Sequence, residues 1–66
     1  MNAITQQQER AVHDIASELA IHHHRSVVTP HPDNNGNLTV AGLDKHNNIR
    51  ELAFVATDGT ISRHDT

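Results

Sequence analysis

The stretch TQQQERAVHDIASELA, residues 5–20, has the pattern of an amphipathic helix and sets the architecture of the chain. Thr5 and Gln8 are spaced as a capping box, in which the Thr hydroxyl accepts the amide proton of the third helical residue and the Gln side chain reaches back to the N-cap. Apolar residues then recur at steps of three and four, which places them on one side of a helix. They are Ala11, Val12, Ile15, Ala16, Leu19 and Ala20. We therefore predict one N-terminal helix of about five turns with a narrow apolar stripe.

Beyond Arg25 the sequence changes to β-branched residues separated by turn-forming Pro, Asp, Asn and Gly. This texture predicts short strands joined by tight turns. The strands are expected at residues 26–29, 37–43 and 49–56, with a short fourth around Ile61, and residues 63–66 are expected to fray. The predicted fold class is α+β, with one N-terminal amphipathic helix packed on a three- to four-stranded antiparallel β-meander. Residues 1–66 are expected to form a single small domain.

Alternation along the strands predicts which side chains share a face of the sheet. In the second strand, one face carries Leu38, Val40 and Gly42, and the other carries Thr39, Ala41 and Leu43. In the third strand, one face carries Leu52, Phe54 and Ala56, and the other carries Ile49, Glu51, Ala53 and Val55. The third strand is thus apolar on both faces, whereas one helix covers only one face of a small sheet.

The chain is short and has few large apolar residues, so covering this second face would add to its stability. The chain has 66 residues, no Cys, no Trp and no Tyr, and Phe54 is its one aromatic residue. A chain this short buries only about 60% of the surface that its unfolded form exposes, so it gains from any further cover. We expect a homodimer through Leu52, Ala53 and Val55, or a foreign partner on the same face. The alternative is that the short strands twist and that the helix ends, or the N-terminal arm with Ile4, cap this face.

Charge argues against nucleic acid as the partner. The formal net charge is −3, with one Lys and four Arg distributed along the chain, whereas a nucleic-acid-binding domain of this size shows a basic stripe. The N-terminal residues lack the pattern of a secretory signal, and no apolar run approaches the ~18 residues that cross a bilayer. We therefore expect a cytoplasmic protein that contacts no membrane.

Histidine is abundant, with seven residues of which His22, His23 and His24 are consecutive. One interpretation is a metal- or ligand-binding module that uses this cluster, with Glu18, His22 and His31 as metal ligands. Consecutive helical residues point about 100° apart, however, and histidines at a helix C-terminus interact favourably with its unpaired carbonyls. Capping is therefore the favoured role. A third hypothesis is a pH switch, in which protonation of the cluster loosens self-association.

Catalytic signatures are missing from the sequence. Ser and Thr are the only hydroxyl nucleophiles, and no motif places one of them beside a base and an oxyanion donor. The segment DNNGN at residues 33–37 fails the calcium-loop pattern, because Gly is fourth rather than sixth. We therefore expect no enzyme activity and no cofactor.

The sequence thus favours a non-enzymatic protein-interaction module that binds and occupies a surface of a larger protein or complex. Adaptors, regulatory subunits and phage- or plasmid-encoded inhibitors, such as anti-CRISPR proteins, belong to this class. Interface hot spots favour arginine and aromatic residues. The residues expected to bind the partner are Arg10, Arg25, Arg50, Arg63 and Phe54.

Overall fold

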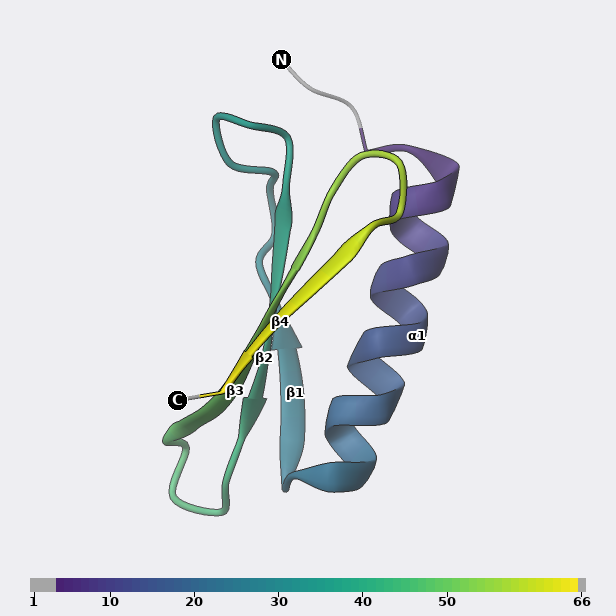
Figure 1. The fold of residues 1–66 in the computed structure, drawn as a ribbon. Helices are drawn as coiled ribbons and strands as arrows, with labels where there is room; N and C mark the ends of the chain where they lie inside the picture. The colour runs from purple at the N-terminus through teal and green to yellow at the C-terminus, as the bar shows by residue number, and fades with distance from the viewer. Residues whose placement is uncertain (1–3, 66) are drawn as a thin grey trace.

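A computed structural model describes residues 4–65 and confirms the α+β architecture. The elements are α1 (Gln6–His22), β1 (Arg25–Val28), β2 (Leu38–Leu43), β3 (Ile49–Val55) and β4 (Ile61–Asp65). The four strands form one antiparallel sheet in the order β1-β2-β3-β4, so each strand pairs with its neighbour in sequence. α1 lies along one face of this twisted sheet, and no helix or strand of the described residues lies against the other (Figure 1).

The predicted capping box is present at the start of α1. The Gln8 amide donates to Thr5 Oγ1 at 3.0 Å, and the Thr5 amide donates to Gln8 Oε1 at 3.4 Å. The Thr5 hydroxyl also donates to the carbonyl of Thr57, next to the β3–β4 turn. At the other end His23 is the C-cap, and its amide donates to the Leu19 carbonyl at 2.9 Å. Side chains of Thr5 and Gln8 thus fix the start of the helix, and the extended backbone conformation of His23 ends it.

Gln8 also joins the helix to the sheet. The residue is completely buried, and its Nε2 donates to the Gly36 carbonyl at 2.7 Å and to the Val55 carbonyl at 3.0 Å. Gly36 belongs to the β1–β2 loop and Val55 ends β3, so one side chain holds three segments together. A buried amide is tolerated there because its donors and its acceptor all have partners.

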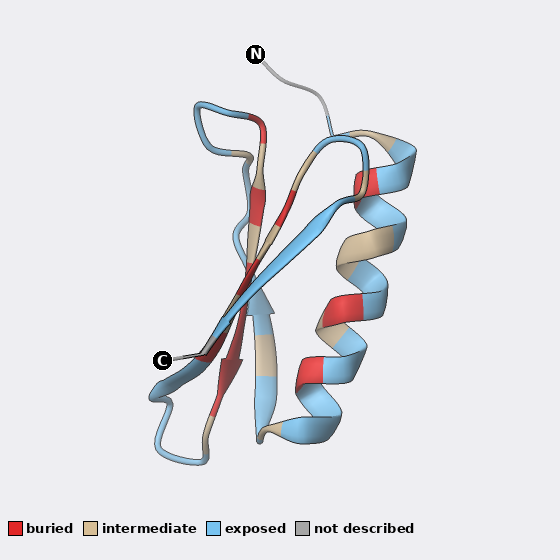
Figure 2. Cartoon of the chain, in the orientation of Figure 1, coloured by how far each residue is buried: buried red, intermediate tan, exposed pale blue. Residues whose placement is uncertain are grey.

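The hydrophobic core lies between α1 and the two central strands. Ile15 and Leu19 of the helix pack on Val40, Ala53 and Val55, and all five are at most 3% exposed (Figure 2). This placement corrects the predicted dimer set. Ala53 and Val55 are covered by the helix, since their parity along β3 directs them to the same side as the core, and they cannot contact a second copy in the folded protein. Leu52 alone of the three lies on the uncovered face.

An irregularity in the pairing of β2 and β3 changes one further prediction. The register joins Gly42 to Glu51 but Leu43 to Ile49, so Arg50 is an extra residue in a β-bulge. Directly paired residues share a face, which puts Ile49 with Leu43 and not with Glu51 as simple alternation predicts. The predicted fraying after Ser62 is also wrong up to Asp65, because β4 pairs with β3 over Ile61–Asp65. Thr66 lies outside the described residues.

Candidate functional site

The candidate site is the face of the sheet opposite α1, here called the open face. Strand pairing identifies its members, because residues joined in register lie on the same side. They are Arg25 and Val27 of β1, Thr39, Ala41 and Leu43 of β2, Ile49, Leu52 and Phe54 of β3, and Ser62 and His64 of β4. The centre of this face is apolar, with Ala41 and Leu43 each 7% exposed, and the polar residues Arg25, Thr39, Ser62 and His64 stand around it.

Exposure is greatest along the margins of this apolar centre. Val27 is 40% exposed and Ile49 is 49% exposed, whereas Leu52 and Phe54 are partly buried by their neighbours within the sheet. The Phe54 ring meets the His64 ring edge-to-face, with centroids 5.4 Å apart and planes at 61°. This geometry is a favourable one for aromatic pairs and holds the Phe54 ring in place on the surface.

The predicted partner-binding residues fall into two groups in space. Phe54 lies in the centre of the open face, and Arg25 and Arg50 are exposed at the end of it, next to the β2–β3 turn. Arg10 is exposed on α1 and does not belong to the open face. Arg63 lies on the helix side of β4, where it forms ion pairs with Glu18 and Glu51. Of the five predicted partner-binding residues, Phe54, Arg25 and Arg50 therefore lie on or beside the open face, and the other two do not.

Arg63 belongs to an ion-pair network between α1 and the sheet. Its Nε donates to Glu51 Oε2 at 2.6 Å, and its Nη1 donates to Glu18 Oε2 at 2.7 Å. His23 Nε2 lies 3.2 Å from Glu51 Oε1, and because an ionised carboxylate only accepts, this contact places the proton on Nε2. Hydrogen bonds from Arg63 and then from His23 hold the pKa of Glu51 below its usual value. The network stabilises the fold, which gives Arg63 a structural role.

The His23 ring has space in the network because residue 42 is glycine. A Cβ atom at Gly42 would lie 2.5 Å from His23 Cδ2, much closer than two carbon atoms approach. The ring therefore lies over the backbone of β2 and reaches Glu51 on β3. The sequence pattern predicts that the three histidines lie at the end of the helix. It does not indicate the contact between His23 and Glu51, because these residues are 28 positions apart.

The predicted metal ligands do not converge. His22 ends α1, whereas β1 runs back along the helix and carries His31 to the loop near the helix N-terminus. A helix of 17 residues is about 25 Å long, which separates His31 from His22 by far more than a coordination sphere. Glu18 is paired with Arg63. The described residues contain no group of three metal-ligating side chains, and we withdraw this ligand set.

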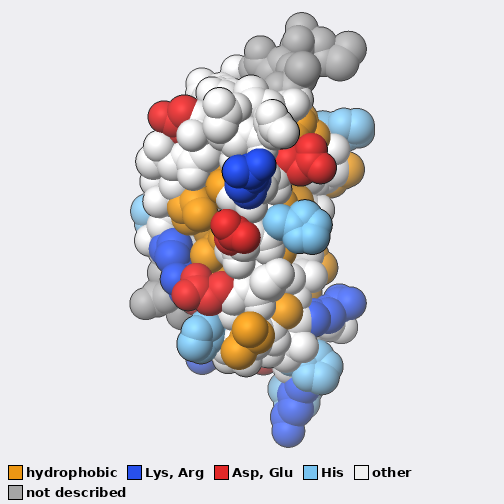
Figure 3. All heavy atoms as spheres, turned by 90° about the vertical axis from the view of Figure 1, so that its right-hand side faces the viewer, with side chains coloured by type: hydrophobic (Ala, Val, Ile, Leu, Met, Phe, Trp, Pro, Cys, Tyr) orange, Lys and Arg blue, Asp and Glu red, His pale blue; other side chains and the backbone are white. Residues whose placement is uncertain are grey.

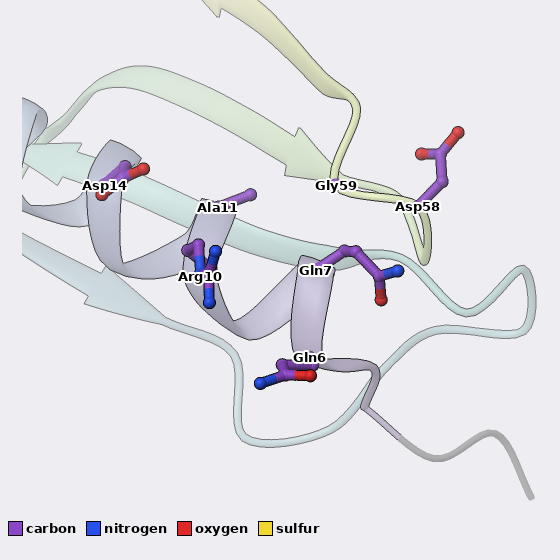
Figure 4. A pocket seen from close by; sticks show the side chains of 7 residues that line it. All are labelled: Gln6, Gln7, Arg10, Ala11, Asp14, Asp58 and Gly59. Atoms are coloured by element: carbon purple, nitrogen blue, oxygen red, sulfur yellow. The ribbon is translucent and has the colours of Figure 1, made fainter.

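An open hollow of about 450 Å³ lies between the start of α1 and the β3–β4 turn. Its lining residues are Gln6, Gln7, Arg10, Ala11, Asp14, Asp58 and Gly59 (Figure 4). The Asp58 carboxylate points away from the helix, and one of its oxygens accepts the Thr60 amide at 2.9 Å. The lining thus has no nucleophile beside a base and forms no enclosed chamber, so it does not support a catalytic role.

The helix side of the molecule differs from the open face. Exposed apolar residues occur there as well, with Ile21 80%, Val28 41% and Ile61 37% exposed, but acidic, basic and histidine side chains stand among them (Figure 3). Mixed charge of this kind is typical of a solvated surface.

The sequence pattern identified some residues of the open face and missed others. Val27 and His64 are absent from the predicted interaction residues, and their contribution depends on strand register, which the sequence specifies only loosely. Ala41 and Leu43 were placed on the correct face by alternation alone. The signal that finds them is the apolar parity of β2.

Comparisons with protein-family models, with curated proteins and with solved structures gave no match to this chain. Among the described residues, no helix combines the length and the apolar character that crossing a bilayer requires.

Proposed function

We propose that this chain is a non-enzymatic protein-interaction module, which binds and occupies a surface of another protein or complex through its open face. The observation that carries the proposal is the uncovered apolar side of the sheet, with Val27 and Ile49 between 40% and 49% exposed around Leu52 and Phe54. A sheet face of this composition costs solubility when it meets only water, so its retention fits a surface with a partner.

The other features of the molecule agree with this role. Glu51, Arg63, His23 and Gln8, the polar groups between helix and sheet, all have hydrogen-bond partners within the fold. A catalytic group, in contrast, is commonly left poised for a substrate. The lack of Cys from all 66 residues fits a reducing compartment, and we place the binding in the cytoplasm.

Site-specific photo-crosslinking tests the proposal. A benzophenone side chain is placed at Phe54 in one variant and at Glu9, exposed on α1, in a matched control, and each is irradiated in a lysate of the encoding organism. We expect adducts with protein from position 54 that disappear when Val27→Thr is added, and none from position 9. Adducts that form at Glu9 and not at Phe54 would place binding on the helix and refute the use of the open face.

The identity of the crosslinked protein then distinguishes among the members of this class. An adaptor is expected to join two host proteins, a regulatory subunit to accompany one enzyme, and an inhibitor encoded by a mobile element to cover a functional surface of a host complex.

A further inference from the structure

We infer that in the isolated protein a second copy of this chain covers the open face, and that the two copies pack face to face about a two-fold axis with their strands running in opposite directions. The partner of the proposed function then displaces the second copy from this face. This inference rests on the proposed function in one respect, the use of the open face for protein contacts. It adds the occupant, the symmetry and the residues that meet.

Charged residues are distributed unequally between the two ends of the sheet. At one end of the sheet lie three cations, Arg25 at the start of β1, Lys45 in the β2–β3 turn and Arg50 in the bulge, together with two acidic residues, Asp44 in the same turn and Asp65 at the end of β4. At the opposite end, the loops at residues 29–37 and 56–60 contain two carboxylates, Asp33 and Asp58, and no Lys or Arg. The sheet therefore has a basic end and an acidic end.

This polarity selects one arrangement of two copies. If the strands of the two copies run in the same direction, basic end meets basic end and acidic end meets acidic end. If they run in opposite directions, each basic end lies near the partner's acidic end, and the two-fold axis repeats the favourable pairing. Asp44, Asp33 and Asp58 each accept backbone amides within their own turns, so their charges count equally. The basic end therefore has a smaller excess of positive charge than its three cations alone would give.

The area of the open face is large enough for a specific contact between two copies. Strands about 4.8 Å apart that rise about 3.3 Å per residue make a four-stranded face about 20 Å on a side, with roughly 500 Å² of accessible surface. Two copies would bury roughly 1,000 Å² together, near the lower limit of specific interfaces. A dimer of this size is expected to dissociate in the micromolar range.

The composition of the face supports contact between copies. None of its described side chains is a carboxylate, and its Arg25 stands at one end, with Arg50 in the adjoining bulge, so that the centre is apolar. Leu52 and Phe54 of each copy can therefore meet the partner's face without burying an unpaired charge. Sheets packed in this way lie about 10 Å apart, which side chains of this size fill.

Sedimentation velocity between about 1 and 200 μM in 50 mM NaCl tests the association. We expect the mass to rise from 7.3 kDa toward twice that value, with a dissociation constant in the micromolar range that increases with salt. The pair Arg25→Glu and Lys45→Glu should weaken the dimer about tenfold, because it places like charges at both ends of the interface. Arg10→Glu, which changes the same charge on the helix side, should leave the constant unchanged.

A second pair of variants removes charge at the acidic end and keeps the turns intact. Asp33→Asn and Asp58→Asn retain an oxygen for the backbone amides that these side chains bind, so the fold should persist while the dimer weakens several-fold. Thermal melting of each variant at low concentration verifies that the monomer is folded.

Cysteine crosslinking tests the direction of packing, and the absence of native Cys makes every disulfide assignable. Asn34→Cys lies at the acidic end and His46→Cys at the basic end. In the inferred dimer a mixture of the two variants gives disulfide-linked pairs under mild oxidation, whereas each variant alone gives few. Predominant crosslinking of each variant with itself would overturn the opposed arrangement.

A protein that stays monomeric up to 200 μM would overturn the dimer. The proposed function is judged separately, by the adducts from Phe54 with other proteins. A single-stranded oligonucleotide such as a thymidine octamer serves as a competitor, and its binding to the open face with higher affinity than the second copy would also overturn the inference.

Discussion

Replacing Gln8 should be the most damaging single change in this chain that removes no large apolar side chain. Gln8 is completely buried, its amide nitrogen donates to the carbonyls of Gly36 and Val55, and its oxygen accepts the Thr5 amide. Gln8→Ala removes all three contacts and leaves a void where the side chain was. Each of the two shorter hydrogen bonds, at 2.7 and 3.0 Å, costs about 1 kcal/mol net, and the 3.4 Å contact with the Thr5 amide costs less. The void and the desolvated carbonyls bring the total to about 3 kcal/mol.

The effect should be large on the scale of this domain. For 60 to 100 residues, 1 kcal/mol lowers the melting temperature by about 4 to 8 °C, so Gln8→Ala should lower it by roughly 12 to 24 °C. Circular dichroism at 222 nm against temperature measures this, with sucrose added if the variant is unfolded at 25 °C. Gln7→Ala, the exposed neighbour in the same turn, is the matched control and should change the melting temperature by less than about 3 °C.

Gln8→Glu separates the hydrogen bonds from the packing. The shape is kept, but an ionised carboxylate cannot donate to the two carbonyls, and burial should raise the pKa of the new side chain. A group with a raised folded pKa favours the fold at low pH, so this variant should be closer to wild type at pH 4 than at pH 7. If Gln8→Ala and Gln7→Ala melt within about 3 °C of each other, the proposed role of Gln8 as the link between helix and sheet is wrong.

Three further changes test the rest of the network and the turns. The pKa of Glu51 is lowered by Arg63 and His23, so its stabilisation is present above the unfolded pKa and disappears as the pH falls through the lower folded value. The free energies of unfolding of wild type and Glu51→Gln, measured by urea titration, should therefore differ by about 1 to 2 kcal/mol at pH 7, since Arg63 is 42% exposed, and converge toward pH 3. Gly42→Ala should cost about 1 to 3 kcal/mol because of the clash with the His23 ring, and much less in a His23→Ala background, as a double-mutant cycle would measure. Gly59→Ala should lower the melting temperature because φ is +90° there, and an unchanged melting curve would contradict this strain.

Local patterns predicted most of the fold. The capping box at Thr5 and the three- and four-residue spacing of Ile15 and Leu19 depend on neighbours within one turn, and the structure has both. The turn residues likewise placed the strands to within one or two positions, because Asp and Gly act on their own backbone. These signals are short in range, so a single sequence carries them in full.

The features that were mispredicted depend on register and on distant partners. Alternation alone could not reveal the bulge at Arg50, which moves Ile49 to the other face, since one additional residue reverses the parity of a strand end. Arg63 was predicted to bind a partner because Arg is common at hot spots, and nothing in the sequence indicated its ion pairs with Glu18 and Glu51, which are 45 and 12 residues away. Contacts at such separations follow from the completed topology and leave no pattern in the sequence.

The distribution of side-chain size over the two faces bears on the proposed use of the open face. The side of the sheet under α1 combines the small Ala53 with Val40 and Val55, which Ile15 and Leu19 of the helix cover. Leu52 and Phe54 are on the opposite side, where a permanently solvated sheet would carry Thr or Lys. If a second copy covers them, the melting temperature of the wild type should rise with protein concentration between 2 and 200 μM, since association stabilises the folded state by mass action. A Leu52→Thr, Phe54→Thr variant should melt at one temperature throughout, and a wild type that also did so would mean that this face is solvated in the isolated protein.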